Sequence, residues 1–247
     1  MIKLQHASAG VVSYSLIGEI TVELSENFGF KINTRSAICT VLTIALQSGS
    51  YWLAQFIIRA FELELHSSAI WLDGHIPFVP AFLIPYIGCF IHWLATFYII
   101  YRDEDGFARL FTAAVMGYAA GFIVFICWPT TMQRPVIEAE GVWRFIYTII
   151  CTLDEPLNLL PSIHCFVSFL CCVSTIKSSS VPRWYAAFST VMLILVCLST
   201  LFVKQHCVLD VFAGVALGSM AWLLAKAAIL QKPARRIYNS LVLTKIC

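Results

Sequence analysis

The chain has 247 residues, of which 60% are hydrophobic and only 12% are charged, and its mean hydropathy is +0.82. Soluble domains average about 45–50% apolar and about 25% charged residues, so the composition excludes a soluble domain and indicates a polytopic membrane protein. The net charge of +2 is small and no basic stripe alternates with aromatic residues, so we expect no nucleic-acid partner.

In chain order, residues 1–35 are polar to mildly amphipathic and are expected to form a cytoplasmic or interfacial segment, with no cleaved signal peptide. The expected fold is all-α, with six transmembrane helices in one bundle over residues 36–230 and a cytoplasmic tail over residues 231–247. The predicted spans are residues 36–58, 81–101, 107–128, 162–176, 184–203 and 206–230. The fourth is shorter than the ~20 residues that usually cross a bilayer, so part of it could lie below the surface.

Lysine and arginine predict the orientation of these spans, because cytoplasmic segments of membrane proteins are enriched in both. If the N-terminus lies inside, twelve of these residues fall in inner segments and four in outer ones: Arg59, Arg134, Arg144 and Lys204. Both termini are therefore expected in the cytoplasm. The connections 129–161 and 203–206 then share the outer face, and residues 143–151 are expected to form a short helix on the membrane surface.

The connection 203–206 leads into the most unusual stretch of the sequence, because Lys204, His206 and Asp210 stand between two long apolar runs. Charged and titratable groups at a membrane boundary are costly and therefore suggest a functional site. His206 and Asp210 are four residues apart, so on a helix the carboxylate can hold one ring nitrogen and leave the other for chemistry. The alternative is that Lys204 extends to the membrane surface and His206 caps the helix.

Two further segments are expected on the same face. One carries Arg134 in a loop stiffened by two prolines, and the other is Pro161-Ser162-Ile163-His164. Free backbone N–H groups at such a helix start, with the Ser162 hydroxyl, suit an anion. Arg134 could also be a simple loop charge, and Pro161-Ser162 an ordinary helix start.

Two histidines, basic side chains and a helix start together favour phosphoryl transfer, in which one histidine attacks phosphorus and the other protonates the leaving oxygen. Zinc binding by the histidines and Asp210 is the alternative, disfavoured because Arg134 and Lys204 would repel a metal ion. Asp154, Glu155 and Asn158 are expected to shape the preceding loop, and His92 to be a packed core residue. The ten cysteines show no CxxC motif and no zinc spacing, so most are expected to be buried and reduced.

The ordered set of segments resembles the type 2 phosphatidic acid phosphatase (PAP2) superfamily of membrane lipid phosphatases. Its pattern is Lys-x6-Arg-Pro, then Pro-Ser-Gly-His, then Ser-Arg-x5-His-x3-Asp. The chain matches it at Arg134-Pro135, at Pro161-Ser162-Ile163-His164, and at Ser199 followed by His206 and Asp210. The resemblance covers roughly residues 70 to 230.

The resemblance implies a role for each matching residue. It implies that His206 forms a phosphohistidine, that Asp210 orients it, and that His164 protonates the leaving group. Arg134, Ser162 and the adjacent Ile163 fall at positions that bind the phosphate. No metal and no other cofactor is implied.

Three positions depart from the pattern, because its lysine, glycine and second arginine fall on Cys127, Ile163 and Thr200. Lys204 could replace one of the missing cations. The third segment, with Trp128-Pro129-Thr130-Thr131 before the Arg-Pro, also resembles the lipid phosphotransferases of the sphingomyelin synthase and inositol-phosphorylceramide synthase type.

We therefore expect a metal-independent phosphatase that hydrolyses a phosphomonoester or diphosphate of a lipid. Its partners would be that lipid and the surrounding membrane lipids, while the oligomeric state is left open. The expected location is a bacterial plasma membrane with the site on the extracytoplasmic side. The alternatives are a lipid phosphotransferase and a non-catalytic membrane transporter or scaffold.

Overall fold

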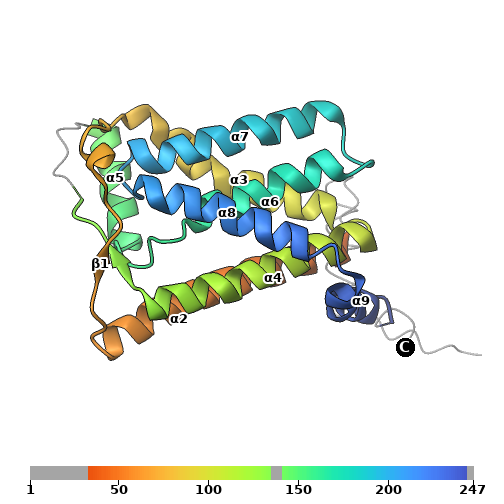
Figure 1. The fold of residues 1–247 in the computed structure, drawn as a ribbon. Helices are drawn as coiled ribbons and strands as arrows, with labels where there is room; N and C mark the ends of the chain where they lie inside the picture. Colours follow the sequence, from red (N-terminus) through yellow and green to blue (C-terminus); the bar gives the residue numbers. More distant parts are fainter. Residues whose placement is uncertain (1–32, 135–140, 244–247) are drawn as a thin grey trace, which may run out of the picture.

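Long helices lying side by side dominate the computed structural model, which describes residues 33–134 and 141–243 (Figure 1). One shorter helix, α5, crosses one end of this bundle, and α9 lies at the other end (Figure 1). The helices are α2 (Thr34–Ala60), α3 (Leu83–Ile100), α4 (Glu104–Cys127), α5 (Gly141–Leu153), α6 (Ile163–Lys177), α7 (Arg183–Phe202), α8 (Val208–Leu224) and α9 (Ala228–Leu243). The all-α prediction is confirmed for the part of the chain that is described.

Two very short strands fasten the connections at the α5 end. Strand β1 (His66–Ser67) pairs in parallel with β2 (Thr130–Thr131), and the His66 ring stacks on Trp128 with 3.8 Å between centroids. Two short 3-10 helices, η1 (Trp71–Gly74) and η2 (Pro80–Phe82), complete the connection between α2 and α3. This connection therefore lies at the end of the bundle where the three candidate segments are.

The helices begin where the sequence supplies a cap. Asn33 accepts the N–H of Ser36 at the start of α2, and Asp103 accepts the N–H of Gly106 at 2.7 Å at the start of α4. Ser162 caps α6 in the same way, with its Oγ accepting the N–H of Cys165 at 3.4 Å. These caps satisfy backbone donors that would otherwise lack partners at a helix end.

Among the described residues, four helices are long and apolar enough to cross a membrane: α2, the helix from Pro80 to Ile100, α4 and α7. Helix α6 has 15 residues and is shorter than that, as the sequence indicated. Helices α8 and α9 are long and apolar enough to cross a membrane only when taken together, as a pair bent by 88°, so they could be one broken span. The described part of the chain thus has four or five candidate spans, while six spans and cytoplasmic termini stay predictions.

The C-terminal part of the chain corrects two predicted boundaries. The predicted span 206–230 begins at Val208 and ends at Leu224, and the chain turns sharply before Ala228. Residues 228–243 then form helix α9, so the predicted tail over 231–247 is helical as far as Leu243. Helix α9 is anchored by Arg235, which binds Glu104 and Asp105 at the start of α4.

The predicted N-terminal segment, residues 1–35, falls almost wholly outside the described residues.

The interior and the outer surface of the bundle are both apolar. Large side chains point outward from several helices, among them Trp52 (67% exposed), Ile91 (71%) and Phe212 (70%). Inside, glycines allow close approach: a Cβ at Gly117 would lie 2.0 Å from the Phe166 ring, and one at Gly214 would lie 2.4 Å from the Ser162 carbonyl oxygen. Small residues at such contacts are typical of helix packing in membranes.

Candidate active site

The two predicted catalytic histidines face each other near the end of the bundle covered by α5. Nε2 of His206 lies 3.4 Å from Nδ1 of His164, and the ring centroids are 5.5 Å apart. The other ring nitrogen of His206, Nδ1, lies 3.4 Å from Oδ2 of Asp210. Asp210 therefore stands behind His206 on the side away from His164, which leaves His206 Nε2 as the atom available for attack.

The loop that carries His206 is held by backbone hydrogen bonds. The N–H groups of Gln205 and His206 both donate to the Thr200 carbonyl, at 3.0 and 3.1 Å. Asp210, fully buried, accepts the N–H of Cys207 at 2.8 Å through Oδ2, so it closes the start of α8 as well as facing His206. Its Oδ1 is buried without a hydrogen-bond partner in the described chain. A carboxylate held in this way has a fixed direction toward the imidazole.

His164 lies in the first turn of α6 and is surrounded by aromatic rings from α3. Tyr86 stacks on it at 4.8 Å, and Phe90 and Trp93 lie 5.7 Å away, all between ring centroids. These three residues are four and three apart in sequence, so they form one stripe on α3. The stripe is a helical pattern visible in the sequence, but its spacing alone does not indicate that it faces His164.

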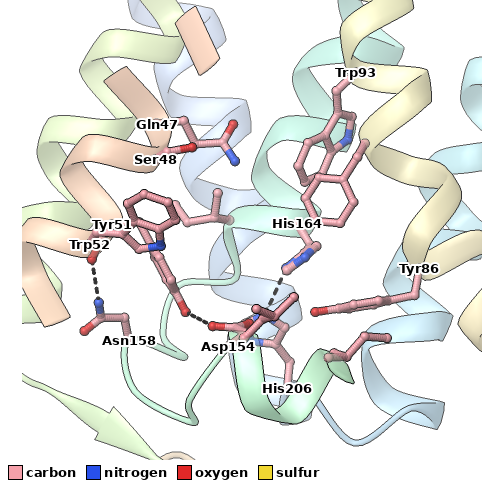
Figure 2. Close-up of a pocket in the computed structure, with 14 residues that line it drawn as sticks. Gln47, Ser48, Tyr51, Trp52, Tyr86, Trp93, Asp154, Asn158, His164 and His206 are labelled. Carbon is pink, nitrogen blue, oxygen red and sulfur yellow. Dashed lines mark hydrogen bonds between the residues drawn. The ribbon is translucent and has the colours of Figure 1, made fainter. Parts of the chain in front are cut away.

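A cavity of about 300 Å³ adjoins both histidines (Figure 2). Its lining is mostly apolar and aromatic, with a few polar groups, which is typical of sites for small molecules and lipid headgroups. The lining residues are Gln47, Ser48, Tyr51, Trp52, Tyr86, Phe90, Trp93, Ile150, Leu153, Asp154, Asn158, Ile163, His164 and His206. Helices α2 and α3 thus supply much of the lining, with residues that the sequence motifs do not include.

Arg134, the predicted phosphate ligand, is brought to the His206 loop but is held by protein groups. Its guanidinium donates to the carbonyls of Cys151 (3.3 Å) and Asp154 (2.6 Å) and to Oε1 of the buried Gln205 (2.6 Å). Its Nε is buried and has no partner in the described part of the chain. The guanidinium therefore joins α5, the loop after it and the residue before His206. Pro135, the other half of this motif, lies outside the described residues.

Lys204 is turned toward another part of the protein. Its ammonium donates to the carbonyl of Asp73 at 3.1 Å and to the carbonyl of Ile76, and its backbone has a positive φ of 55°. It is absent from the cavity lining. Ser162 is fully buried as the cap of α6, and Ile163 lines the cavity beside His164. The structure thus brings Ile163 to the cavity with the histidines and leaves Lys204 outside it.

Two positions where the family pattern has a cation add no charge here. Cys127 ends α4, is exposed and does not line the cavity. Thr200 is fully buried, and its hydroxyl donates to the Cys197 carbonyl at 2.9 Å. No lysine or arginine is among the described residues that line the cavity.

The described residues offer neither a metal centre nor a thiolate at the site. Within ranges 33–134 and 141–243, no group of three or more His, Cys, Asp or Glu side chains is placed to hold a metal ion. Cys207 adjoins His206 in sequence, but burial and the nearby Asp210 carboxylate raise the pKa of its thiol to about 12. A thiol with this pKa stays protonated near neutral pH, so it is a poor nucleophile.

Asp73 and Asp154 also belong to the site, although their spacing in the sequence does not indicate it. Asp73 accepts the N–H of Val208 at the start of α8, and Asp154 lines the cavity. Both lie in or beside connections, whose course depends on tertiary contacts. Asp154 was expected to shape the loop, and its backbone carbonyl does so by binding Arg134.

Comparison with known proteins gives one match. The family model described as the PAP2 superfamily matches residues 59–224, which include His164, His206 and Asp210. No curated protein and no solved structure matches the chain.

Proposed function

The chain belongs to the PAP2 superfamily, and we propose that it is a phosphatase that releases phosphate from a lipid phosphomonoester or diphosphate. Membership in this family supports a phosphatase-type enzyme that acts on lipids in the membrane. The proposed intermediate is a phosphohistidine on His206. The observation that carries the proposal is the order Asp210, His206, His164 beside a cavity. One nitrogen of His206 faces the carboxylate and the other faces the second imidazole.

In the first step, Nε2 of His206 attacks phosphorus and the bond from phosphorus to the lipid oxygen breaks. His164 gives that oxygen a proton, because an alkoxide is a poor leaving group. Asp210 favours the positively charged imidazole ring that forms during attack, since its carboxylate lies beside Nδ1. Nε2 of His206 and Nδ1 of His164 are 3.4 Å apart, so the two side chains must separate before a phosphoryl group can lie between them.

In the second step, water attacks phosphorus and gives its proton to His164. The bond between phosphorus and Nε2 of His206 breaks, and phosphate leaves. The Nε of Arg134 and the start of α6 at Ser162 are the proposed donors to the phosphate oxygens. The site would need no metal ion in this scheme, because the histidines supply both the nucleophile and the proton.

The lipid would reach the histidines from the side, between helices. Helices α2 and α3 line the cavity with side chains that are also exposed on the outer surface, such as Trp52 (67%) and Phe90 (45%). A lipid tail can stay among such apolar side chains while its phosphate enters the cavity. We propose that this end of the bundle is extracytoplasmic, on the basis of the lysine and arginine distribution.

A lipid phosphotransferase is the second candidate, favoured by the charge of the site. A phosphomonoester carries about −1.5 to −2 near neutral pH and needs cations, whereas a phosphodiester carries a single negative charge. The cavity lining has no lysine or arginine among its described members and includes the carboxylate of Asp154. In a transferase, a lipid hydroxyl would replace water in the second step.

The test is turnover by the purified protein in detergent with a chelator, for a panel of lipid phosphates, diphosphates and diesters. Wild-type protein should release phosphate and form an acid-labile phosphoenzyme, and His206→Ala should do neither. Phosphate release without an added acceptor supports the phosphatase, whereas turnover only with an added lipid alcohol supports the transferase. Lipid binding without turnover would point to the non-catalytic alternative, and activity that zinc restores after chelation would refute metal independence.

A further inference from the structure

Among the described residues, Asp154 supplies the carboxylate of the cavity lining, and no charged side chain pairs with it. It forms no ion pair with any basic side chain of the described residues. Arg134 binds the backbone carbonyl of Asp154 rather than its carboxylate. An unpaired carboxylate in an apolar cavity of a membrane protein is costly, and such residues usually take part in function.

Tyr51 fixes the direction of this carboxylate. The Tyr51 hydroxyl donates to Oδ1 of Asp154 at 2.7 Å, and Figure 2 shows it pointing at the carboxylate from α2. Within the described chain, no donor is bonded to Oδ2. Asp154 is therefore held at one oxygen and can accept a hydrogen bond from a ligand at the other.

The neighbouring polar lining is also rich in acceptors. Asn158 is 1% exposed, lines the cavity, and has an Oδ1 atom without a partner in the described ranges. Its amide donates to the Tyr51 carbonyl at 3.2 Å, which leaves the oxygen unbound. Asp154 and Asn158 thus offer acceptors, while phosphate oxygens are themselves acceptors and would be repelled there. A ligand that contacts this part of the cavity needs hydrogen-bond donors.

We propose that Asp154, oriented by Tyr51, is a specificity-determining residue that accepts a hydrogen bond from a hydroxyl group of the substrate. The hydroxyl lies on the polar group attached to the phosphate, and the charge of Asp154 disfavours a second negative charge on that phosphate. The inference rests on the second candidate of the proposed function, in which the substrate is a lipid phosphodiester, and on both candidates in placing the phosphate at His206. It adds a residue and a ligand chemistry that the sequence motifs do not contain.

The test compares three lipids with the same diacylglycerol: phosphatidylglycerol, phosphatidylmethanol and phosphatidate. The first carries headgroup hydroxyls, the second lacks them, and the third has a doubly charged phosphate. Release of diacylglycerol measures attack on all three. Wild type should prefer phosphatidylglycerol, and Asp154→Asn should lower its kcat/KM relative to phosphatidylmethanol by about 10-fold or more, since hydrogen bonds to charged groups are strong.

Glu155→Gln is the matched control. It makes the same change of charge one residue later, on an exposed carboxylate that binds Arg59 outside the cavity lining. Its preference among the three lipids should equal that of wild type. Asp154→Asn should also raise the relative kcat/KM for phosphatidate. A uniform loss on all three lipids, or no change, would overturn the proposal.

Binding separates this proposal from the proposed function. In a His206→Ala background, the same lipids are compared for binding by native mass spectrometry, with and without Asp154→Asn. A preference for phosphatidylglycerol that Asp154→Asn removes supports the role of Asp154 even if no lipid is turned over. The absence of any such preference in binding and in turnover would refute it, whereas phosphatase activity could still stand.

Discussion

Asp73 Oδ1 accepts the backbone N–H of Val208 at 2.8 Å, although the two residues are 135 positions apart in the chain. Its other oxygen accepts the N–H of Ile70 at 2.7 Å, and its carbonyl accepts the ammonium of Lys204. The connection between α2 and α3 is therefore fastened to both sides of His206. A residue outside the sequence motifs thus holds the loop that presents His206.

Replacing Asp73 with alanine is expected to loosen this loop. The Val208 N–H would lose its acceptor, and an unsatisfied buried donor costs about 1–3 kcal/mol. We expect a lower melting temperature and a reduced kcat, measured by thermal unfolding and by turnover in detergent. Asp73→Asn keeps one acceptor oxygen, so its melting temperature and its kcat should both stay close to those of wild type. Equal loss in the two variants would contradict the role of that hydrogen bond.

Replacing His164 with alanine should remove the proton donor for the leaving oxygen. General acid catalysis contributes about 10²–10⁴-fold, so turnover of a lipid substrate should fall by that amount. A phosphate ester of an acidic phenol needs little protonation, so its turnover should fall much less. The comparison of the two substrates in one variant separates a proton donor from a structural residue.

His92→Ala is the control for His164. His92 is also buried, but it lies on α3, contacts the Ser189 hydroxyl at 3.0 Å and does not line the cavity. His92→Ala should lower the turnover of both substrates by a similar factor, smaller than the one for the lipid substrate in His164→Ala. If His164→Ala lowered the turnover of both substrates equally, the assignment of His164 as proton donor would be wrong.

Arg134 and Gln205 should behave as a coupled pair. The guanidinium donates to Gln205 Oε1 at 2.6 Å and to two carbonyls, and a lysine cannot reproduce this planar arrangement. Arg134→Lys should therefore lose most of the activity that Arg134→Ala loses. In a double-mutant cycle, the double variant of Gln205→Ala and Arg134→Ala should lose less free energy of unfolding than the two single variants lose in sum. Additive effects would show that the contact contributes nothing.

The sequence predicted the parts of this site that depend on local spacing. His206 and Asp210 do face each other at 3.4 Å, although His206 lies in the loop before α8 and not on the helix. The Pro-Ser-Ile-His segment does begin a helix, with His164 in its first turn. The short helix expected over 143–151 is confirmed as α5. These features follow from helix periodicity and capping, which a single segment carries by itself.

The remaining features depend on how distant segments meet. The turn after Leu224 occurs within an apolar run that reads as a continuous span, so hydropathy could not locate it. That Arg134 binds phosphate stays a prediction, but its protein partners Cys151, Asp154 and Gln205 come from two other segments, so its spacing in the sequence could not reveal them. Asp73 reaches α8 only because β1 and η1 lay its connection across that end of the bundle.

Gly214 sets the distance between α6, which carries His164, and α8, which follows the His206 loop. A Cβ at this position of α8 would lie 2.4 Å from the Ser162 carbonyl oxygen and 3.1 Å from Cβ of Cys165, both at the start of α6. Backbone at the first contact cannot rotate away, so Gly214→Ala should push α8 from α6. His206 would then move from His164, which follows Ser162 by two residues. Overpacking of this kind typically costs about 1–3 kcal/mol.

The expected result for Gly214→Ala is therefore a lower melting temperature together with a large loss of turnover. Gly88→Ala on α3 is the control, since no atom lies within 4 Å of its added Cβ, and alanine is the better helix former. Gly218→Ala should be intermediate, because its Cβ would meet the Phe169 ring at 2.8 Å, a side chain that can move, one turn farther from His206. If Gly214→Ala matched Gly88→Ala in both stability and turnover, the contact between α8 and α6 would not control the separation of the histidines.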